Sequence, residues 1–161
     1  MEGGLRASVL FIHVALSAIW MGHHAPNMYI TLEADYAVRI IVYLAEQDRR
    51  IDANSISLNT GVSLRFALKI LRNLVGSGIT KSFKGTQGGY ELNRVPSAIT
   101  LKDILQAVEG EYVFSRCLNS ESKCTKSSSC DCKSREAFSK ITEKVCEMLE
   151  EVKVSDLMRD T

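Results

Sequence analysis

The spacing of apolar residues predicts a mainly helical chain. From about residue 31 onward, apolar positions recur every three or four residues, which is the period of a helix buried along one face. Serine or threonine precedes several of these segments, where its side chain can cap a helix, and glycine follows several of them. The predicted helical segments are 32–47, 53–59, 64–75, 96–110 (with Thr100 as N-cap and Gly110 as stop), 134–154 and 155–160.

Two of these helices form a helix-turn-helix pattern. The short second helix stops at Gly61, which supplies a tight turn, and Ser63 then caps the longer helix over 64–75. A plain helical hairpin would show the same pattern, but the following residues favour a DNA-binding fold. The segments TKSF (80–83) and GYEL (89–92) are typical of two short strands around a glycine-containing loop. Helix, turn, helix and a basic hairpin is the order of a winged helix-turn-helix.

The sequence therefore predicts a mainly α fold with a small β-hairpin wing, an α+β arrangement. The helix over 134–154 carries an apolar stripe with charges on either side, so we expect it to pack against the same helix of a second copy as a dimerisation helix. Four regions are expected: a leader over 1–27, a winged helix-turn-helix DNA-binding domain over 28–110, a cysteine-rich loop over 111–133, and the dimerisation helix with a C-terminal tail over 134–161.

The first 27 residues differ in character from the rest. Segment 5–22 is apolar and has about the minimum length for a signal peptide or a membrane anchor. The preceding positive charge is weak, no clear cleavage site follows, and His13 is costly in lipid. The sequence from Met28 onward has the pattern of a complete cytoplasmic protein. We therefore expect 1–27 to be a non-native leader or the result of a start codon assigned too early, and we expect no membrane partner. The alternative is a membrane-tethered or exported interaction module.

The distribution of charged residues along the chain is more informative than the net charge. The 161 residues include 20 Lys+Arg and 19 Asp+Glu, and this net charge of +1 argues against a protein that coats nucleic acid non-specifically. Between Ser63 and Lys84, however, all charged residues are basic. A solvated charged face normally mixes both signs, so this stretch favours DNA. Its basic residues are Arg65, Lys69, Arg72, Lys81 and Lys84.

The helix over 64–75 carries the candidate DNA contacts. Arg65 and Lys69 lie one turn apart and Arg72 follows three residues later, so they share a face. Such a face suits a major groove, where Arg and Lys contact base edges and phosphates. Lys84, at the tip of the hairpin, is placed to reach an adjacent phosphate or the minor groove. The predicted DNA-binding residues are Ser63, Arg65, Phe66, Lys69, Arg72, Lys84, Gly85 and Gln87.

Four of the five cysteines lie in one polar segment, 117–132, which indicates a metal or redox site in a reducing compartment rather than a disulfide framework. Thiolates converging on an iron–sulfur cluster would order such a loop. Zinc is the rival, although structural zinc usually binds cysteine pairs that are two to four residues apart. An inert loop or a thiol–disulfide switch also stays open. The candidate ligands are Cys117, Cys124, Cys130 and Cys132.

The chain from residue 28 to about 160 resembles the winged-helix transcription regulators of the Rrf-two (Rrf2) family. The resemblance rests on MYITLEADYAVRI (28–40), GVSLRFALKILRNLVGSGI (61–79), the wing KGTQGGY (84–90) and the cysteine loop. It implies a cytoplasmic homodimeric regulator, expected to be a repressor, that binds a palindromic operator in double-stranded DNA. An enzyme is not expected, because no nucleophile–base pair or phosphate-binding loop is found.

The resemblance also implies a cofactor. Cluster-binding members of the family, the IscR-like and NsrR-like branches, carry three cysteines where Cys117, Cys124 and Cys130 stand, whereas the CymR-like branch lacks them. A 2Fe–2S or 4Fe–4S cluster that senses nitric oxide, redox state or iron–sulfur supply is therefore expected. The alternative is a zinc- or thiol-based redox-sensing regulator of the same fold without iron.

The fourth ligand of such a cluster separates the branches. The histidine of IscR-like members is replaced by Lys133, which cannot bind iron while protonated. NsrR-like members can use an aspartate donated by the partner subunit, and Asp35 stands at the matching place. Asp35 is equally explained as an acidic residue that is favourable in the first turn of a helix. Cys132 is a less favoured fourth ligand, because one intervening residue strains joint ligation with Cys130.

Overall fold

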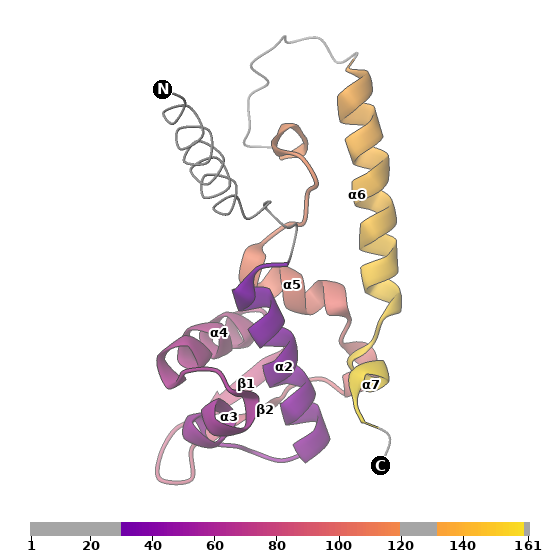
Figure 1. Ribbon diagram of the computed structural model, residues 1–161. Coiled ribbons are helices and arrows are strands. Elements are labelled where there is room, and N and C mark those ends of the chain that lie inside the picture. The colour runs from indigo at the N-terminus through magenta and orange to yellow at the C-terminus, as the bar shows by residue number, and fades with distance from the viewer. Residues whose placement is uncertain (1–29, 120–131, 160–161) are drawn as a thin grey trace, which may run out of the picture. The chain divides into compact units, whose positions relative to one another are not determined.

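The computed structural model describes residues 30–119 and 132–159 (Figure 1). The expected leader over 1–27, together with Cys124 and Cys130, lies outside the described residues. In the described ranges no helix combines the length and apolar character needed to cross a membrane. The elements are α2 (Leu32–Gln47), α3 (Ala53–Thr60), α4 (Leu64–Gly76), β1 (Thr80–Phe83), β2 (Gly89–Leu92), the 3-10 turn η1 (Pro96–Ala98), α5 (Leu101–Glu109), the 3-10 turn η2 (Arg116–Leu118), α6 (Lys133–Glu151) and α7 (Val154–Leu157).

Side-chain caps start several of these helices. The hydroxyl of Thr31 accepts a hydrogen bond from the N–H of Ala34 at 3.2 Å and caps α2. The carboxylate of Asp52 caps α3, and hydrogen bonds from Ser55 hold the pKa of Asp52 below its ordinary value. Ser63 occupies the N-cap position of α4 as predicted, but its side chain makes no cap hydrogen bond. The hydroxyl of Ser63 is therefore not committed to the helix.

A single hydrophobic core joins α2, α3, α4 and α5. Helices α2, α4 and α5 turn apolar stripes inward and α3 contributes Ile56, and the buried side chains of this core are almost completely removed from water. Burial of each Ile or Leu side chain contributes roughly 1.5–3 kcal/mol, so this core fixes how α4 is rotated about its own axis. The largest fully buried side chains include Ile40, Ile41, Leu44, Ile56, Ile70, Leu71, Leu74 and Ile104.

The wing is an antiparallel hairpin whose strands cover the predicted residues, TKSF and GYEL. Ile51, in the segment after α2, pairs with Tyr90 through two backbone hydrogen bonds of 2.9 and 2.8 Å, which attach the hairpin to the helical core. The close approach requires glycine at position 89, where φ is +156° and an added Cβ would lie 2.6 Å from the carbonyl oxygen of Ile51.

Helix α5 begins after Thr100 and ends before Gly110, as the predicted N-cap and stop require, and Thr100 and Asp103 form a capping box at its start. The residues before it form the 3-10 turn η1 and the extended Ile99. Two other helices differ from their predicted extents, and the first is α6, which is Lys133–Glu151 rather than 134–154. The last helix is Val154–Leu157 rather than 155–160, because the carboxylate of Asp156 accepts from the N–H of Lys153 and sets the start of the helix. The N–H of Val154 also donates to the carbonyl of Ile99 at 3.0 Å, which joins the two segments.

The long helix α6 has none of its residues fully buried within the described chain. It packs against α5, where Lys102 forms an ion pair with Glu150, and it also contacts Phe114, whose ring stacks on Phe138 with centroids 6.1 Å apart and whose N–H donates to the hydroxyl of Thr142 at 3.1 Å. Along its apolar side, Ile141 and Met148 are 42% and 58% exposed. Part of the apolar stripe that predicts a partner helix therefore lies open to solvent in the single chain, whereas Val145 and Leu149 on the same stripe are half-buried.

Candidate nucleic-acid interface

Helix α4 presents one buried and one exposed face, and the exposed face carries the predicted DNA contacts. Ala67, Ile70, Leu71 and Leu74 are completely buried. Because α4 has the helical period of 3.6, burial of this set forces positions 65, 68, 69 and 72 outward. The exposed side chains on this face are Leu64, Arg65, Leu68, Lys69 and Arg72.

An open hollow of about 670 Å³ runs along this exposed face. It gathers all the residues of the helix-turn-helix that the sequence predicts to contact DNA, together with two leucines. Arginine and lysine side chains mixed with apolar ones match what a major groove offers, namely phosphates, acceptor edges of bases and thymine methyl groups. The lining residues are Ser63, Leu64, Arg65, Phe66, Leu68, Lys69 and Arg72.

Phe66 has a structural role in addition to its place in the hollow. Its ring is partly buried and meets the ring of Tyr36 on α2 edge to face, with centroids 5.5 Å apart at 76°. The contact locks the first turns of α4 against α2. A DNA contact by Phe66 stays a prediction.

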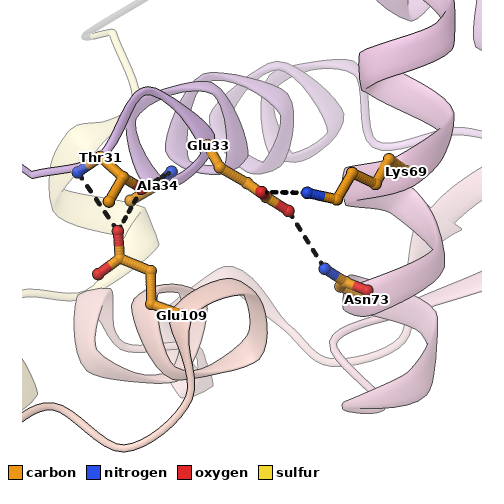
Figure 2. Close-up of polar contacts among 6 residues, drawn as sticks. All are labelled: Thr31, Glu33, Ala34, Lys69, Asn73 and Glu109. Atoms are coloured by element: carbon orange, nitrogen blue, oxygen red, sulfur yellow. Dashed lines mark hydrogen bonds and ion pairs between the residues drawn. The ribbon is translucent and has the colours of Figure 1, made fainter.

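A carboxylate from α2 reaches the basic face of α4 (Figure 2). Glu33 accepts a hydrogen bond from Nζ of Lys69 at 2.5 Å and another from Nδ2 of Asn73 at 3.3 Å. The stretch from Ser63 to Lys84 holds no acidic residue, as the sequence shows, but an acidic side chain from another helix lies against it in space. The packing of α2 on α4 brings Glu33 to Lys69 across 36 positions of sequence, and no local pattern could have revealed it.

Lys81 is neutralised in the same way by Glu91 on the neighbouring strand, at 2.9 Å. By contrast, Arg65, Arg72 and Lys84 form no ion pair with any other described residue, and all three are exposed. Their charges are thus available to phosphates, and they carry the positive potential of this surface.

The tip of the wing is exposed at Lys84, Gly85 and Gln87, and the predicted DNA contact by these residues stays a prediction. Gly85 has a φ of +100°, which favours glycine, and its carbonyl accepts from the N–H of Gly88 at 2.9 Å to close the turn.

Arg50 supports this wing, a role that the sequence pattern does not predict. In the sequence, Arg50 belongs only to the charged residues that follow a helix. Its guanidinium lies 3.4 Å from the centroid of the Phe83 ring. The same group donates to the carbonyl of Gln87 at 3.4 Å and forms an ion pair with Glu91 at 3.5 Å. Arg50 therefore links the core to both strands of the hairpin.

The predicted metal ligands are only partly within the described chain. Cys117 is half-buried in η2, with its Sγ 3.2 Å from the hydroxyl oxygen of Ser115. Cys132 is exposed at the start of α6, and Asp35 forms an ion pair with Arg39 at 2.7 Å. Among the described residues no three potential metal-ligating side chains of His, Cys, Asp or Glu gather. The cluster ligands therefore stay a prediction.

Comparison with known proteins agrees with the fold. A relative from Rhizobium meliloti (strain 1021), Protein aau3, is 30% identical over 134 residues, which are 82% of this chain and 86% of the relative. The structure of CymR, described as the global cysteine regulator of B. subtilis, superposes with a TM-score of 0.65 at 25% identity, covering 81% of this chain and 96% of that one. IscR of T. potens has a TM-score of 0.61 at 23% identity over 83% of this chain and 88% of that one, and this likeness concerns the fold.

The model of one family spans nearly all of the described chain. It matches residues 30–160 and is described as Rrf2, iron-dependent transcriptional regulator. The winged fold, the exposed basic face of α4 and this match agree with one another. The chain belongs to the Rrf2 family of transcriptional regulators.

Proposed function

We propose that the protein is a cytoplasmic homodimeric repressor, without catalytic activity, that binds a palindromic operator in double-stranded DNA. Helix α4 would enter the major groove, and Lys84 at the wing tip would contact a neighbouring phosphate or the minor groove. The observation that carries the proposal is the open face of α4, where Arg65 and Arg72 stay unpaired among the described residues beside a hollow about 670 Å³ in volume. A dimer would place two such helices in successive major grooves.

Alanine substitution tests the interface. Arg65→Ala and Arg72→Ala should each weaken operator binding about tenfold in a gel-shift titration, because a well-placed arginine contact contributes about 1–3 kcal/mol. Lys140→Ala, on the exposed side of α6, removes the same charge away from α4 and serves as the control. Unchanged affinity in both arginine variants would remove α4 from the interface.

The proposed signal input is an iron–sulfur cluster, of 2Fe–2S or 4Fe–4S type, bound by Cys117, Cys124 and Cys130. Asp35 of the partner subunit, or less favourably Cys132, would complete the ligand set. Thiolates are the donors that such clusters require, and both Cys117 and Cys132 are free thiols in the structure. Nitric oxide, oxygen and iron shortage each change such clusters chemically, so the state of the cluster would report these conditions to the protein.

The protein would hold the cluster ligands in place and transmit a change at the cluster to the DNA-binding helix α4. Phe114, three residues before Cys117, is held on α6 by the Phe138 ring and by Thr142, so the cysteine-bearing segment is anchored to the proposed dimerisation helix. For Asp35 to serve as a ligand, its pairing with Arg39 at 2.7 Å must be given up or shared. A change at the ligands would then shift the population between two arrangements of α6 and α4.

Anaerobic purification tests the cofactor. We expect a coloured protein that contains iron and sulfide, and Cys124→Ser should remove the visible absorbance. Cys146→Ser is the matched control, because Cys146 lies on α6 apart from the proposed ligands, and this variant should keep the colour. A colourless wild-type protein that contains zinc would instead support the zinc-based regulator, and a metal-free protein would support the thiol-based one.

A further inference from the structure

Glu33 is the acidic side chain that meets the basic face of α4, and it is held more firmly than its partner (Figure 2). Its side chain is 18% exposed, whereas that of Lys69 is 58% exposed. One carboxylate oxygen accepts from Lys69 and the other accepts from Asn73, one turn further along α4. Glu33 is therefore the fixed member of the pair, and the ammonium of Lys69 is the mobile one.

The backbone around Glu33 is anchored from a third helix. The hydroxyl of Thr31 caps α2 by accepting from Ala34, and it also donates to a carboxylate oxygen of Glu109 at the end of α5. The N–H of Thr31 donates to the same oxygen at 3.3 Å. The first turn of α2 is thus tied to α5, and Glu33 cannot follow Lys69 if that side chain turns toward DNA.

We propose that Glu33 sets the DNA affinity of the protein by neutralising Lys69, and this inference rests on the proposed function of α4. A phosphate that recruits Lys69 must displace the carboxylate of Glu33, so the ammonium exchanges one anionic partner for another and little is gained. The displaced carboxylate keeps Asn73 as its hydrogen-bond partner. Glu33 therefore weakens backbone attraction, and binding relies more on Arg65 and Arg72.

The substitution Glu33→Gln tests this directly. Gln has the same shape, and its carbonyl oxygen still accepts from Asn73, but it no longer neutralises Lys69. The full chain is titrated against a fluorescent random-sequence duplex of about 30 base pairs, long enough for two half-sites, at several salt concentrations. We expect E33Q to bind about three- to tenfold more tightly at low salt and to steepen the slope of log K against log salt by about 0.9, the value for one additional phosphate contact.

Two further variants isolate the pair. Glu46→Gln makes the same charge change on the same helix, about 20 Å further along its axis and beyond the screening length of about 10 Å, so less than a twofold effect is expected. Lys69→Gln should abolish the gain, so that the double variant E33Q/K69Q binds like K69Q. Circular-dichroism melting of each variant confirms that the comparison is made between folded proteins.

The outcomes separate this inference from the function on which it rests. It is overturned if E33Q binds no better than E46Q, if the gain persists without Lys69, or if E33Q binds more weakly, which would make Glu33 itself a DNA contact. If the wild-type protein does not bind the duplex, or if Arg65→Ala and Arg72→Ala leave binding unchanged, then the proposed function of α4 fails first.

Discussion

Lys81 and Glu91 stand opposite each other across the wing, and their side chains form an ion pair with 2.9 Å between nitrogen and oxygen. The hydrogen bond from Lys81, together with the charges of Lys81 and Arg50, holds the pKa of Glu91 below its ordinary value, although partial desolvation acts in the opposite direction. The carboxylate of Glu91 thus connects the two strands to each other and to Arg50. Part of the stability of the wing therefore depends on the negative charge of Glu91.

The first prediction concerns acid stability. A carboxyl group whose folded pKa is lowered contributes stability that is present above its unfolded value of about 4.5 and is lost as pH falls through its folded pKa. Glu91→Gln should therefore lower Tm near neutral pH, and the difference from wild type should close as pH falls below about 4.5. The check is thermal melting at a series of pH values.

Glu111→Gln is the control for that series, because Glu111 is exposed and forms no ion pair with another described residue. Its Tm should follow the wild-type curve. Both variants keep Asp52, whose own lowered pKa adds acid sensitivity to every protein in the comparison and therefore cancels. A Glu91→Gln difference that is the same at every pH would show that the Lys81–Glu91 charge pair contributes nothing.

A second prediction concerns the packing of α4. Leu71 is completely buried, so Leu71→Ala should lower the free energy of unfolding by about 2–5 kcal/mol through lost burial and the cavity that remains. Leu68 lies on the exposed face of the same helix, and Leu68→Ala should cost well under half as much. Urea unfolding measures both. Equal losses would contradict the rotation of α4 that exposes Arg65 and Arg72.

The attachment of the wing to the core gives a third prediction. Gly89→Ala would place a Cβ 2.6 Å from the carbonyl oxygen of Ile51, so the backbone pairing of Ile51 with Tyr90 should open and Tm should fall. Gly76→Ala is the matched control, because an added Cβ at that position meets no atom within 4 Å. That variant should be neutral or slightly stabilising. Equal Tm values for the two variants would show that the wing does not need the close approach.

Most secondary structure could be predicted because its signals are local. Thr31 and Thr100 cap helices through hydrogen bonds to residues three positions away, and Gly61 ends α3 in a left-handed conformation. Both wing strands match the predicted residues for the same reason, since alternation and flanking glycines lie within one short segment. The start of the last helix was misplaced because the side chain of Asp156 and the buried Val154, rather than periodicity, fix it.

Only part of the site could be predicted, because some of its basic side chains are paired with acidic side chains from other elements of the fold. Helical spacing correctly places Arg65, Lys69 and Arg72 on one exposed face. Spacing does not reveal that Glu33 lies against Lys69 or that Arg50 covers the ring of Phe83, since those contacts depend on how separate elements pack. A stretch of sequence without acidic residues is therefore weak support for a purely positive surface.

The final prediction concerns the open side of α6. An apolar stripe with Ile141 and Met148 42% and 58% exposed would leave apolar area in water, and the same stripe of a second copy is the occupant that the dimer proposal requires. Ile141→Asp should convert a dimer into monomers in size-exclusion chromatography with light scattering. It should also weaken operator binding, because the two half-site contacts are no longer linked.

Ser139→Asp introduces the same charge on the opposite side of α6 and should leave the molecular mass at that of a dimer. Far-ultraviolet circular dichroism distinguishes a folded monomer from an unfolded chain, because α2 to α5 bury their core without help from α6. A wild-type protein that is monomeric at micromolar concentration, or an Ile141→Asp variant that keeps the dimer mass, would contradict the assignment. The interface of the dimer would then have to be sought on a face other than the apolar stripe of α6.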